Sequence, residues 1–218
     1  MEFISGMFSG LMQNLIGHPF DTIKVLQQNG KSPFFKSPLD YYRGLQYPTI
    51  MMMITQGINF DILHKSYIYT NNYYVSGMLS GIVTSPFHYF FDYYKIKKQM
   101  NKENFSLIEI IITKGKFATF LREAKAMSIY YGTYYYLTDT QNCSVILAGS
   151  ITGVLSWLFT YPLDVIKTRQ MTYNISFSKA LKKGNLLKGI NICLLRAFFV
   201  NSVAFYSYEF MIKNLKKT

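Results

Sequence analysis

The stretch Pro19-Phe20-Asp21-Thr22-Ile23-Lys24 sets the pattern of the whole chain. It returns after 71 residues as Phe90-Phe91-Asp92-Tyr93-Tyr94-Lys95, and after a further 72 as Pro162-Leu163-Asp164-Val165-Ile166-Lys167. Each copy keeps an aspartate three residues before a lysine, although the second copy has Phe90 where the others have proline. Self-similarity at a fixed period indicates tandem structural repeats.

Two further features recur in the same order around this motif. Small residues spaced by four precede it, as Gly6 and Gly10, Gly77 and Gly81, and Gly149 and Gly153. A basic residue followed by glycine comes after it, as Arg43-Gly44, Lys114-Gly115 and Lys188-Gly189. We therefore expect three tandem units, over residues 1–71, 72–144 and 145–218. The small residues have a structural role in this interpretation, because they let helices approach closely in lipid.

Each unit contains two long segments that lack turn signals, at residues 3–28, 46–68, 74–99, 117–138, 145–171 and 190–213. At about 1.5 Å per residue, each segment would extend roughly 30 to 40 Å as a helix, which is enough to cross a bilayer with some tilt. The sequence therefore predicts an all-α membrane protein with six transmembrane helices.

Basic residues are distributed unevenly between the linkers. Of the 23 Lys and Arg residues, ten lie in the linkers within the units, at residues 29–45, 100–116 and 172–189. None lies in the linkers between units, near residues 66–75 and 139–146. Such an asymmetry orients a helix bundle in a membrane, with the basic linkers on the inner side and both termini on the other.

Two other classes of protein are disfavoured. A net charge of +12 suits a nucleic-acid-binding protein, but its charges should gather on one face rather than in repeated linkers. The chain has no nucleophile elbow, phosphate loop, His-Glu-x-x-His motif or dinucleotide fingerprint, so we do not expect an enzyme. Cys143 and Cys193 form no disulfide framework. We expect no catalytic residue, metal, cofactor or bound nucleic acid.

The threefold motif resembles the Pro-x-Asp-x-x-Lys signature of the mitochondrial carrier family, over essentially the whole chain. The resemblance implies a six-helix barrel with pseudo-threefold symmetry. Such a barrel exchanges small metabolites across the mitochondrial inner membrane as a monomer. Membrane lipid, with cardiolipin as a candidate, is a further partner that the resemblance implies.

The resemblance also assigns the repeated charges to a gate at the matrix end of the central cavity. It implies the ion pairs Asp21 with Lys95, Asp92 with Lys167 and Asp164 with Lys24, braced by Gln28 and Gln99. Proline inside a helix removes a backbone hydrogen bond and bends the helix. The expected kinks are at Pro19, Pro86 and Pro162, with Pro86 about one turn early.

A second charge network, which the family places near the opposite end, is eroded in this chain. The third unit keeps Tyr208-Glu209 but has Ile212 where a base belongs. The second unit has Tyr134-Tyr135 in the corresponding place, and the first has Leu63-His64. The difference in stability between the two closed ends sets the resting state of a carrier. We therefore expect the closure at this second network to be the weaker one, and the carrier to rest open at this end.

The family's substrate-contact positions correspond here to Met51, Met52, Arg122, Glu123 and Arg196. Charged residues inside a membrane segment mark a substrate path by default, and the alternative is a structural Arg122–Glu123 pair. The arginines suit a carboxylate or phosphate, and Glu123 suits an ammonium or sulfonium. The Arg122-Glu123 pair resembles that of carriers for amino acids and S-adenosylmethionine, and we favour an adenosyl or nucleotide-like solute. The alternatives are an amino-acid or carboxylate carrier and a carrier-like membrane scaffold without transport.

Overall fold

The computed structural model describes residues 1–28, 42, 45–99, 107–187 and 190–215, and the regular structure of this part is helical. It has six long helices: α1 (Glu2–Gln28), α2 (Gln46–Thr70), α3 (Tyr73–Gln99), α5 (Lys116–Tyr135), α6 (Val145–Tyr173) and α8 (Ile190–Leu215). Two short helices, α4 (Leu107–Ile112) and α7 (Phe177–Lys182), lie between long ones, and a π-helical turn, η2 (Tyr136–Thr140), extends α5.

The ends of the long helices lie within three residues of the predicted ones. Local polar side chains explain several of these ends. Asn71 takes a left-handed conformation with φ 48° and ends α2, while the Asn72 side-chain oxygen accepts a hydrogen bond of 2.9 Å from the backbone N–H of Tyr74 and starts α3. Ser144 caps α6 in the same way, since its hydroxyl accepts from the Leu147 N–H.

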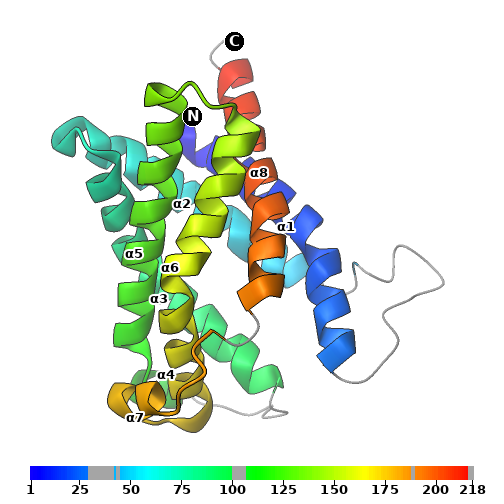
Figure 1. The fold of residues 1–218 in the computed structure, drawn as a ribbon, viewed down its shortest axis with the longest axis vertical. Helices are drawn as coiled ribbons and strands as arrows, with labels where there is room; N and C mark the ends of the chain where they lie inside the picture. Colours follow the sequence, from blue (N-terminus) through cyan, green and yellow to red (C-terminus); the bar gives the residue numbers. More distant parts are fainter. Residues whose placement is uncertain (29–41, 43–44, 100–106, 188–189, 216–218) are drawn as a thin grey trace.

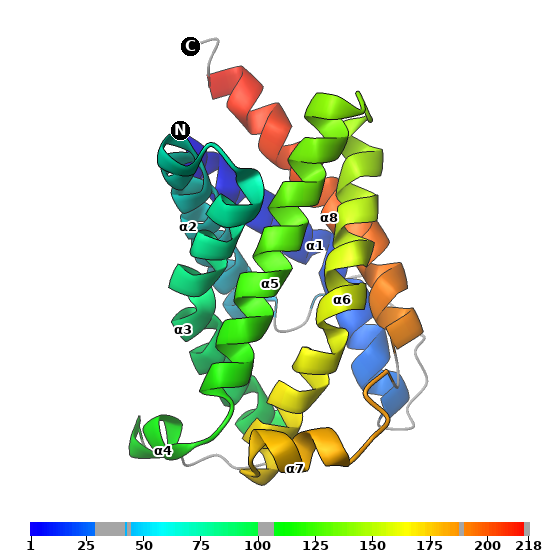
Figure 2. The ribbon, with the colours of Figure 1, turned by 60° about the vertical axis from the view of Figure 1, so that its left-hand side comes forward.

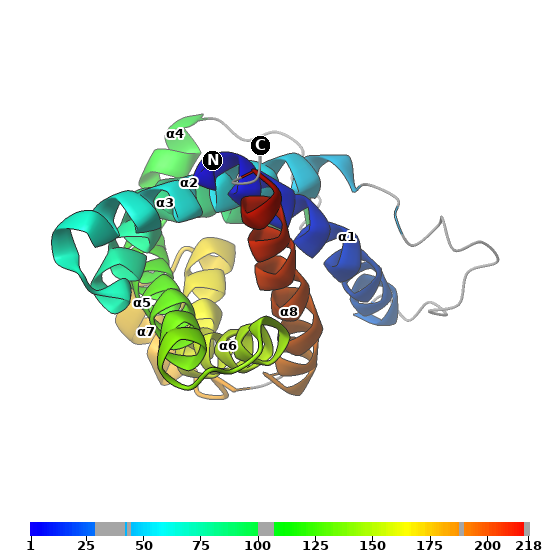
Figure 3. The same cartoon turned by 90° about the horizontal axis from the view of Figure 1, so that it is seen from above.

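The six long helices form a closed ring. Each contacts the next in the order α1, α2, α3, α5, α6 and α8, and α8 contacts α1 (Figure 3). Within each predicted unit, the two long helices are neighbours in this ring. A further contact joins α3 and α6, which are not neighbours in the ring because α5 lies between them.

The two ends of the ring carry different parts of the chain. Both termini lie at one end, which we call the terminal end (Figure 1). The short helices α4 and α7 lie at the other end, which we call the linker end (Figures 1 and 2). The described parts of the second and third basic linkers therefore lie opposite the termini, as expected, while nearly all of the first linker lies outside the described residues.

Polar side chains are buried in the ring, whereas large apolar side chains face outward. Gln13, Asn59 and Thr84 are among the buried polar residues, while Leu158 and Leu195 are 43% and 59% exposed. Among the described helices, α6 is the one whose length and composition alone would allow it to cross a membrane. Buried polar and charged residues lower the hydropathy of its neighbours, so composition understates the apolar outer surface.

The three prolines lie inside helices that continue past them, with Pro19 in α1, Pro86 in α3 and Pro162 in α6. Proline has no N–H, so Pro86 cannot donate to the carbonyl of Ile82. The hydroxyl of Ser85 donates to that carbonyl instead, at 2.8 Å. This substitute hydrogen bond satisfies the freed backbone group without breaking α3.

Glycines set the separation of the helices within each unit. A Cβ atom added at Gly10 would lie 2.3 Å from the Met52 carbonyl oxygen, and one added at Gly81 would lie 2.3 Å from the Glu123 carbonyl oxygen. Both neighbours are backbone atoms, which cannot move aside like a side chain. The close approach of α1 to α2 and of α3 to α5 therefore requires glycine at these positions.

The Gly81→Ala substitution should lower the stability of the full chain in detergent by roughly 1 to 3 kcal/mol, because the added methyl group forces α3 away from α5. Alanine is otherwise the better helix former, so the direction of the change is informative. Thermal unfolding of Val83→Ala, at a 47% exposed site on the same helix, is the matched control. An unchanged or raised unfolding temperature for Gly81→Ala would contradict this packing argument.

Candidate functional site

A buried ion pair joins α3 and α6 near the linker end. The Lys167 ammonium lies 2.6 Å from a carboxylate oxygen of Asp92 and 3.3 Å from one of Asp164 on its own helix. Lys167 is only 3% exposed. The sequence analysis paired Asp92 with Lys167, and the structure brings them into contact across the ring, between helices that are not ring neighbours.

The other expected gate residues cannot all be placed. The side chains of five of them lie outside the described residues: Asp21, Lys24, Gln28, Lys95 and Gln99. Asp164, the expected partner of Lys24, is described. Its carboxylate contacts Lys167 and lies 3.2 Å from Nε of Arg122 on α5.

Arg122 and Glu123, which were expected to bind substrate, belong to the same network. Nη1 of Arg122 donates a hydrogen bond to Oε1 of Glu123, and its guanidinium lies 5.0 Å from the centre of the Trp157 ring. The Glu123 side chain is 1% exposed. Because Arg122 also contacts Asp164, the expected gate and the expected substrate contacts form one connected group of charges.

His88 is a member of this network that the sequence analysis did not assign to it. Its Nε2 lies 3.9 Å from Oε2 of Glu123. A signal was present in the sequence, because His88 is four residues before Asp92 and therefore on the same face of α3. We call the six residues the charge cluster: His88, Asp92, Arg122, Glu123, Asp164 and Lys167.

The remaining expected contact residues lie on the other side of the ring. Met51 and Met52 of α2 are partly buried, and the Met52 carbonyl packs against Gly10 of α1. Arg196 of α8 lies against α1, because a Cβ atom at Gly17 would be 3.1 Å from its Nη2. Arg122 lies against α6 instead, so the two arginines are held by different helices.

Pairs of buried, uncharged polar side chains also lie between α1, α2 and α3. The Gln56 amide nitrogen donates to Gln13 at 3.1 Å, and the Thr84 hydroxyl donates to Asn59 at 3.0 Å. All four side chains are buried. The sequence analysis did not single them out, although polar residues in otherwise apolar helices are a signal for an interior lining.

The second helix of each unit contributes to a cluster of aromatic side chains near the terminal end. Phe60 of α2 stacks on Tyr208 of α8 with ring centroids 3.7 Å apart, and Tyr134 of α5 stacks on Phe205 of α8 at 3.5 Å. Phe60 also contacts Tyr131 of α5 edge to face, at 5.2 Å. Because α2, α5 and α8 are not neighbours in the ring, these contacts cross its centre.

Hydrogen bonds around His64 of α2 tie further helices to the aromatic cluster. The Tyr208 hydroxyl and His64 Nε2 are 2.7 Å apart, and the Tyr135 hydroxyl lies 3.3 Å from the same nitrogen. Tyr208 also donates to the Glu2 carboxylate of α1. Tyr73 of α3 stacks on Tyr135 at 3.8 Å. The hydrogen bonds and rings thus connect α1, α2, α3, α5 and α8.

The strength of the closure at this end stays a prediction, and the structure shows contacts there that the search for charge pairs did not reveal. The sequence analysis examined the positions of Leu63-His64, Tyr134-Tyr135 and Tyr208 for opposite charges and found them eroded. The structure places these same residues in the aromatic cluster, where most are buried. Stacking and burial of large rings hold this end together in place of ion pairs.

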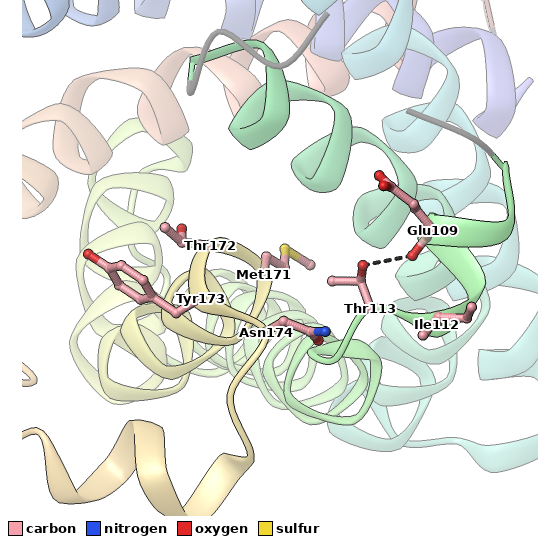
Figure 4. Close-up of a pocket in the computed structure, with 7 residues that line it drawn as sticks. All are labelled: Glu109, Ile112, Thr113, Met171, Thr172, Tyr173 and Asn174. Atoms are coloured by element: carbon pink, nitrogen blue, oxygen red, sulfur yellow. Dashed lines mark hydrogen bonds between the residues drawn. The ribbon is translucent and has the colours of Figure 1, made fainter. Parts of the chain in front are cut away.

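A cavity of about 360 Å³ lies near the linker end, between α4 and the last turn of α6 (Figure 4). Its lining includes Glu109, Thr113 and Asn174, and the Thr113 hydroxyl donates to the Glu109 carbonyl at 2.7 Å. None of the charge-cluster residues lines it. It is separate from the site that the sequence analysis predicted.

The described helices thus form a closed ring with a polar interior and with charged residues between the helices. Residues 138–218 match the family model described as Mitochondrial carrier protein. The chain is 24% identical to solute carrier family 25 member 45 of Mus musculus, over 97% of this chain and 98% of that protein. It is 26% identical to the mitochondrial arginine transporter BAC2 of Arabidopsis thaliana, over 98% and 91% of the two chains.

A third relative is the mitochondrial basic amino acids transporter of Rattus norvegicus, which is 26% identical over 78% of this chain and 70% of its own length. The family model thus matches the last third of the chain, and the relatives that align over most of it carry the names of mitochondrial or solute carriers.

A double-mutant cycle should detect the ion pair between α3 and α6. Asp92→Asn and Lys167→Gln should each lower the unfolding temperature, and the double variant should lose less stability than the two single losses together, by about 0.5 to 3 kcal/mol. The control cycle uses Asp61 and Lys65, which are 2.8 Å apart on α2 but exposed, with coupling of about 0.3 to 0.5 kcal/mol. If the stability losses of Asp92→Asn and Lys167→Gln were strictly additive, the two side chains would not form a stabilising ion pair.

Removal of the Phe60 ring should open the terminal end to a water-soluble reagent. In a Cys143→Ser, Cys193→Ser background, a single cysteine at the buried Ala126 should react severalfold faster with an impermeant maleimide when Phe60→Ala is added. Phe87→Ala, at a 42% exposed site on α3, is the control. Equal labelling rates in the two variants would mean that Phe60 does not close this end.

Proposed function

We propose that this chain carries an amino acid with a cationic or zwitterionic character across the mitochondrial inner membrane. Its six long helices would span the membrane as a barrel, with the three predicted units as pseudo-symmetric parts. Alternating access would open the terminal end and the linker end in turn. The aromatic cluster closes one end, and the Asp92–Lys167 pair holds the other in this proposal.

The observation that carries this proposal is the buried Arg122–Glu123 pair between the helices of the ring. An amino acid presents a carboxylate and an ammonium a short distance apart. Arg122 has the planar fork of donors that binds a carboxylate, and the Glu123 carboxylate accepts from an ammonium. An arginine and a glutamate inside a membrane protein are expensive to bury and are therefore candidates for a transport path.

The similarities favour this substrate class over the adenosyl or nucleotide-like solute that the sequence analysis preferred. The relatives carry names for arginine and for basic amino acids. They therefore support the amino-acid carrier that was the alternative. Arg196, Met51 and Met52 remain proposed contacts on the far side of the path.

Uptake by proteoliposomes that contain the purified full chain tests this function. The panel comprises arginine, lysine, glutamate, glycine, ADP and S-adenosylmethionine, each also loaded inside as the exchange partner. We expect uptake of an amino acid and little uptake of ADP or S-adenosylmethionine. Uptake of the adenosyl compounds alone would contradict the substrate class, and silence across the panel would favour a membrane scaffold.

Substitution of Glu123 by glutamine should lower this uptake by roughly tenfold to a hundredfold, because hydrogen bonds to charged groups contribute about 1.5 to 3 kcal/mol. Lys125→Gln is the matched control, since Lys125 lies on the same helix but is exposed. Thermal unfolding of both variants separates loss of transport from loss of fold. Full uptake by Glu123→Gln in a folded protein would exclude Glu123 from the transport path.

A further inference from the structure

We propose that His88 and the cationic group of the substrate compete for the Glu123 carboxylate, so that binding of the substrate releases a proton. This inference rests on the proposed amino-acid transport and deepens it, because it assigns a second occupant to the same carboxylate. His88 thereby becomes a specificity-determining residue that couples transport of a cation to the movement of a proton.

The two oxygens of Glu123 have different surroundings. Oε1 accepts the hydrogen bond from Arg122, whereas Oε2 faces Nε2 of His88 at 3.9 Å. This separation is too long for a hydrogen bond. Nε2 of His88 is buried and has no hydrogen-bond partner in the described part of the chain. A ring nitrogen without a hydrogen-bond partner therefore faces a carboxylate oxygen across a gap.

A buried polar group that lacks a hydrogen bond is unfavourable, and more so when it is charged. Two groups compete for Oε2 in this proposal. A proton on the imidazole turns Nε2 into a charged donor that needs only a small shift to reach the carboxylate. An ammonium or guanidinium group of a substrate provides its own N–H donors at the same oxygen.

The other charged groups of the cluster are paired mainly with one another. From α5, the Arg122 guanidinium is shared between Glu123 and Asp164 of α6. Lys167 of α6 is shared between Asp164 and Asp92, and Asp92 lies one turn after His88 on α3. In the described part of the cluster, two cations thus serve three carboxylates. The charged residues of α2, which also packs on α3, are Asp61, His64 and Lys65 in its second half, toward the terminal end.

The exchange balances in protons and charge. When the imidazole of the empty site carries a proton, it neutralises Glu123. When a cationic group arrives, the N–H bond of the imidazolium breaks and the proton passes to water, while the neutral ring keeps the electron pair. His88 can make this change because imidazole is the side chain that titrates between about pH 5 and 8. The His88 side chain as a whole is 24% exposed, so water reaches the ring, although Nε2 itself is buried in this structure.

Calorimetric titration of the purified full chain with arginine, in two buffers of different ionisation enthalpy, counts the protons released on binding. Near neutral pH the protein should release up to one proton per bound arginine, and His88→Asn and His88→Gln should release none while still binding. His18→Asn makes the same chemical change on α1 and should behave like the unchanged protein. Binding without proton release would overturn this inference and leave the proposed function intact. No arginine binding at any pH would overturn both.

Transport provides the second measurement. Arginine keeps its positive charge between pH 6 and 8, so a change of KM across this range reports on the protein. KM should rise severalfold from pH 8 to pH 6, because protons and the substrate compete for the same carboxylate. It should stay constant in His88→Asn and change as before in His18→Asn. A pH-dependent KM that survives in both folded His88 variants would refute the competition.

Discussion

A buried lysine that reaches across the ring to a carboxylate is the interaction on which the linker end depends. Removal of an ammonium group from water costs several kcal/mol, and only close, well-placed acceptors offset this penalty. Lys167 finds them in Asp92 on α3 and Asp164 on its own helix. Arg122 shares Asp164 and thereby ties α5 to the same point. Three helices are therefore held at one place by charges that cannot be left unpaired.

The opposite end reaches the same geometric result with different chemistry. There the second helices of the units meet through Phe60, Tyr134 and Tyr208, and hydrogen bonds to His64 orient the rings. When water enters, hydration stabilises the separated charges of an ion pair. Exposure to water is unfavourable for aromatic rings that were buried. The two ends should therefore respond in opposite ways to wetting of the interior. In the proposed carrier, this difference can keep both ends from opening together.

The sequence predicted what depends on local or repeated signals. Helix ends were predictable because the repeats fix the units and because residues such as Asn71 end helices by their own conformation. The Asp92–Lys167 contact follows a pattern that repeats three times. The stacking of Phe60 on Tyr208 could not be predicted, since it joins residues far apart in the chain and leaves no period in the sequence. His88 was overlooked because a single histidine in a helix usually serves packing.

Ser85 and Pro86 give α3 a property that an unbroken helix lacks. In an ordinary helix a bend stretches a backbone hydrogen bond, whereas here the strained bond is absent and a side-chain hydroxyl occupies the carbonyl of Ile82. A hydroxyl can rotate and follow its acceptor as the angle changes. The segment after Pro86, which carries both His88 and Asp92, can thus change its angle relative to the segment before it. That earlier segment stays packed through Gly77 and Gly81.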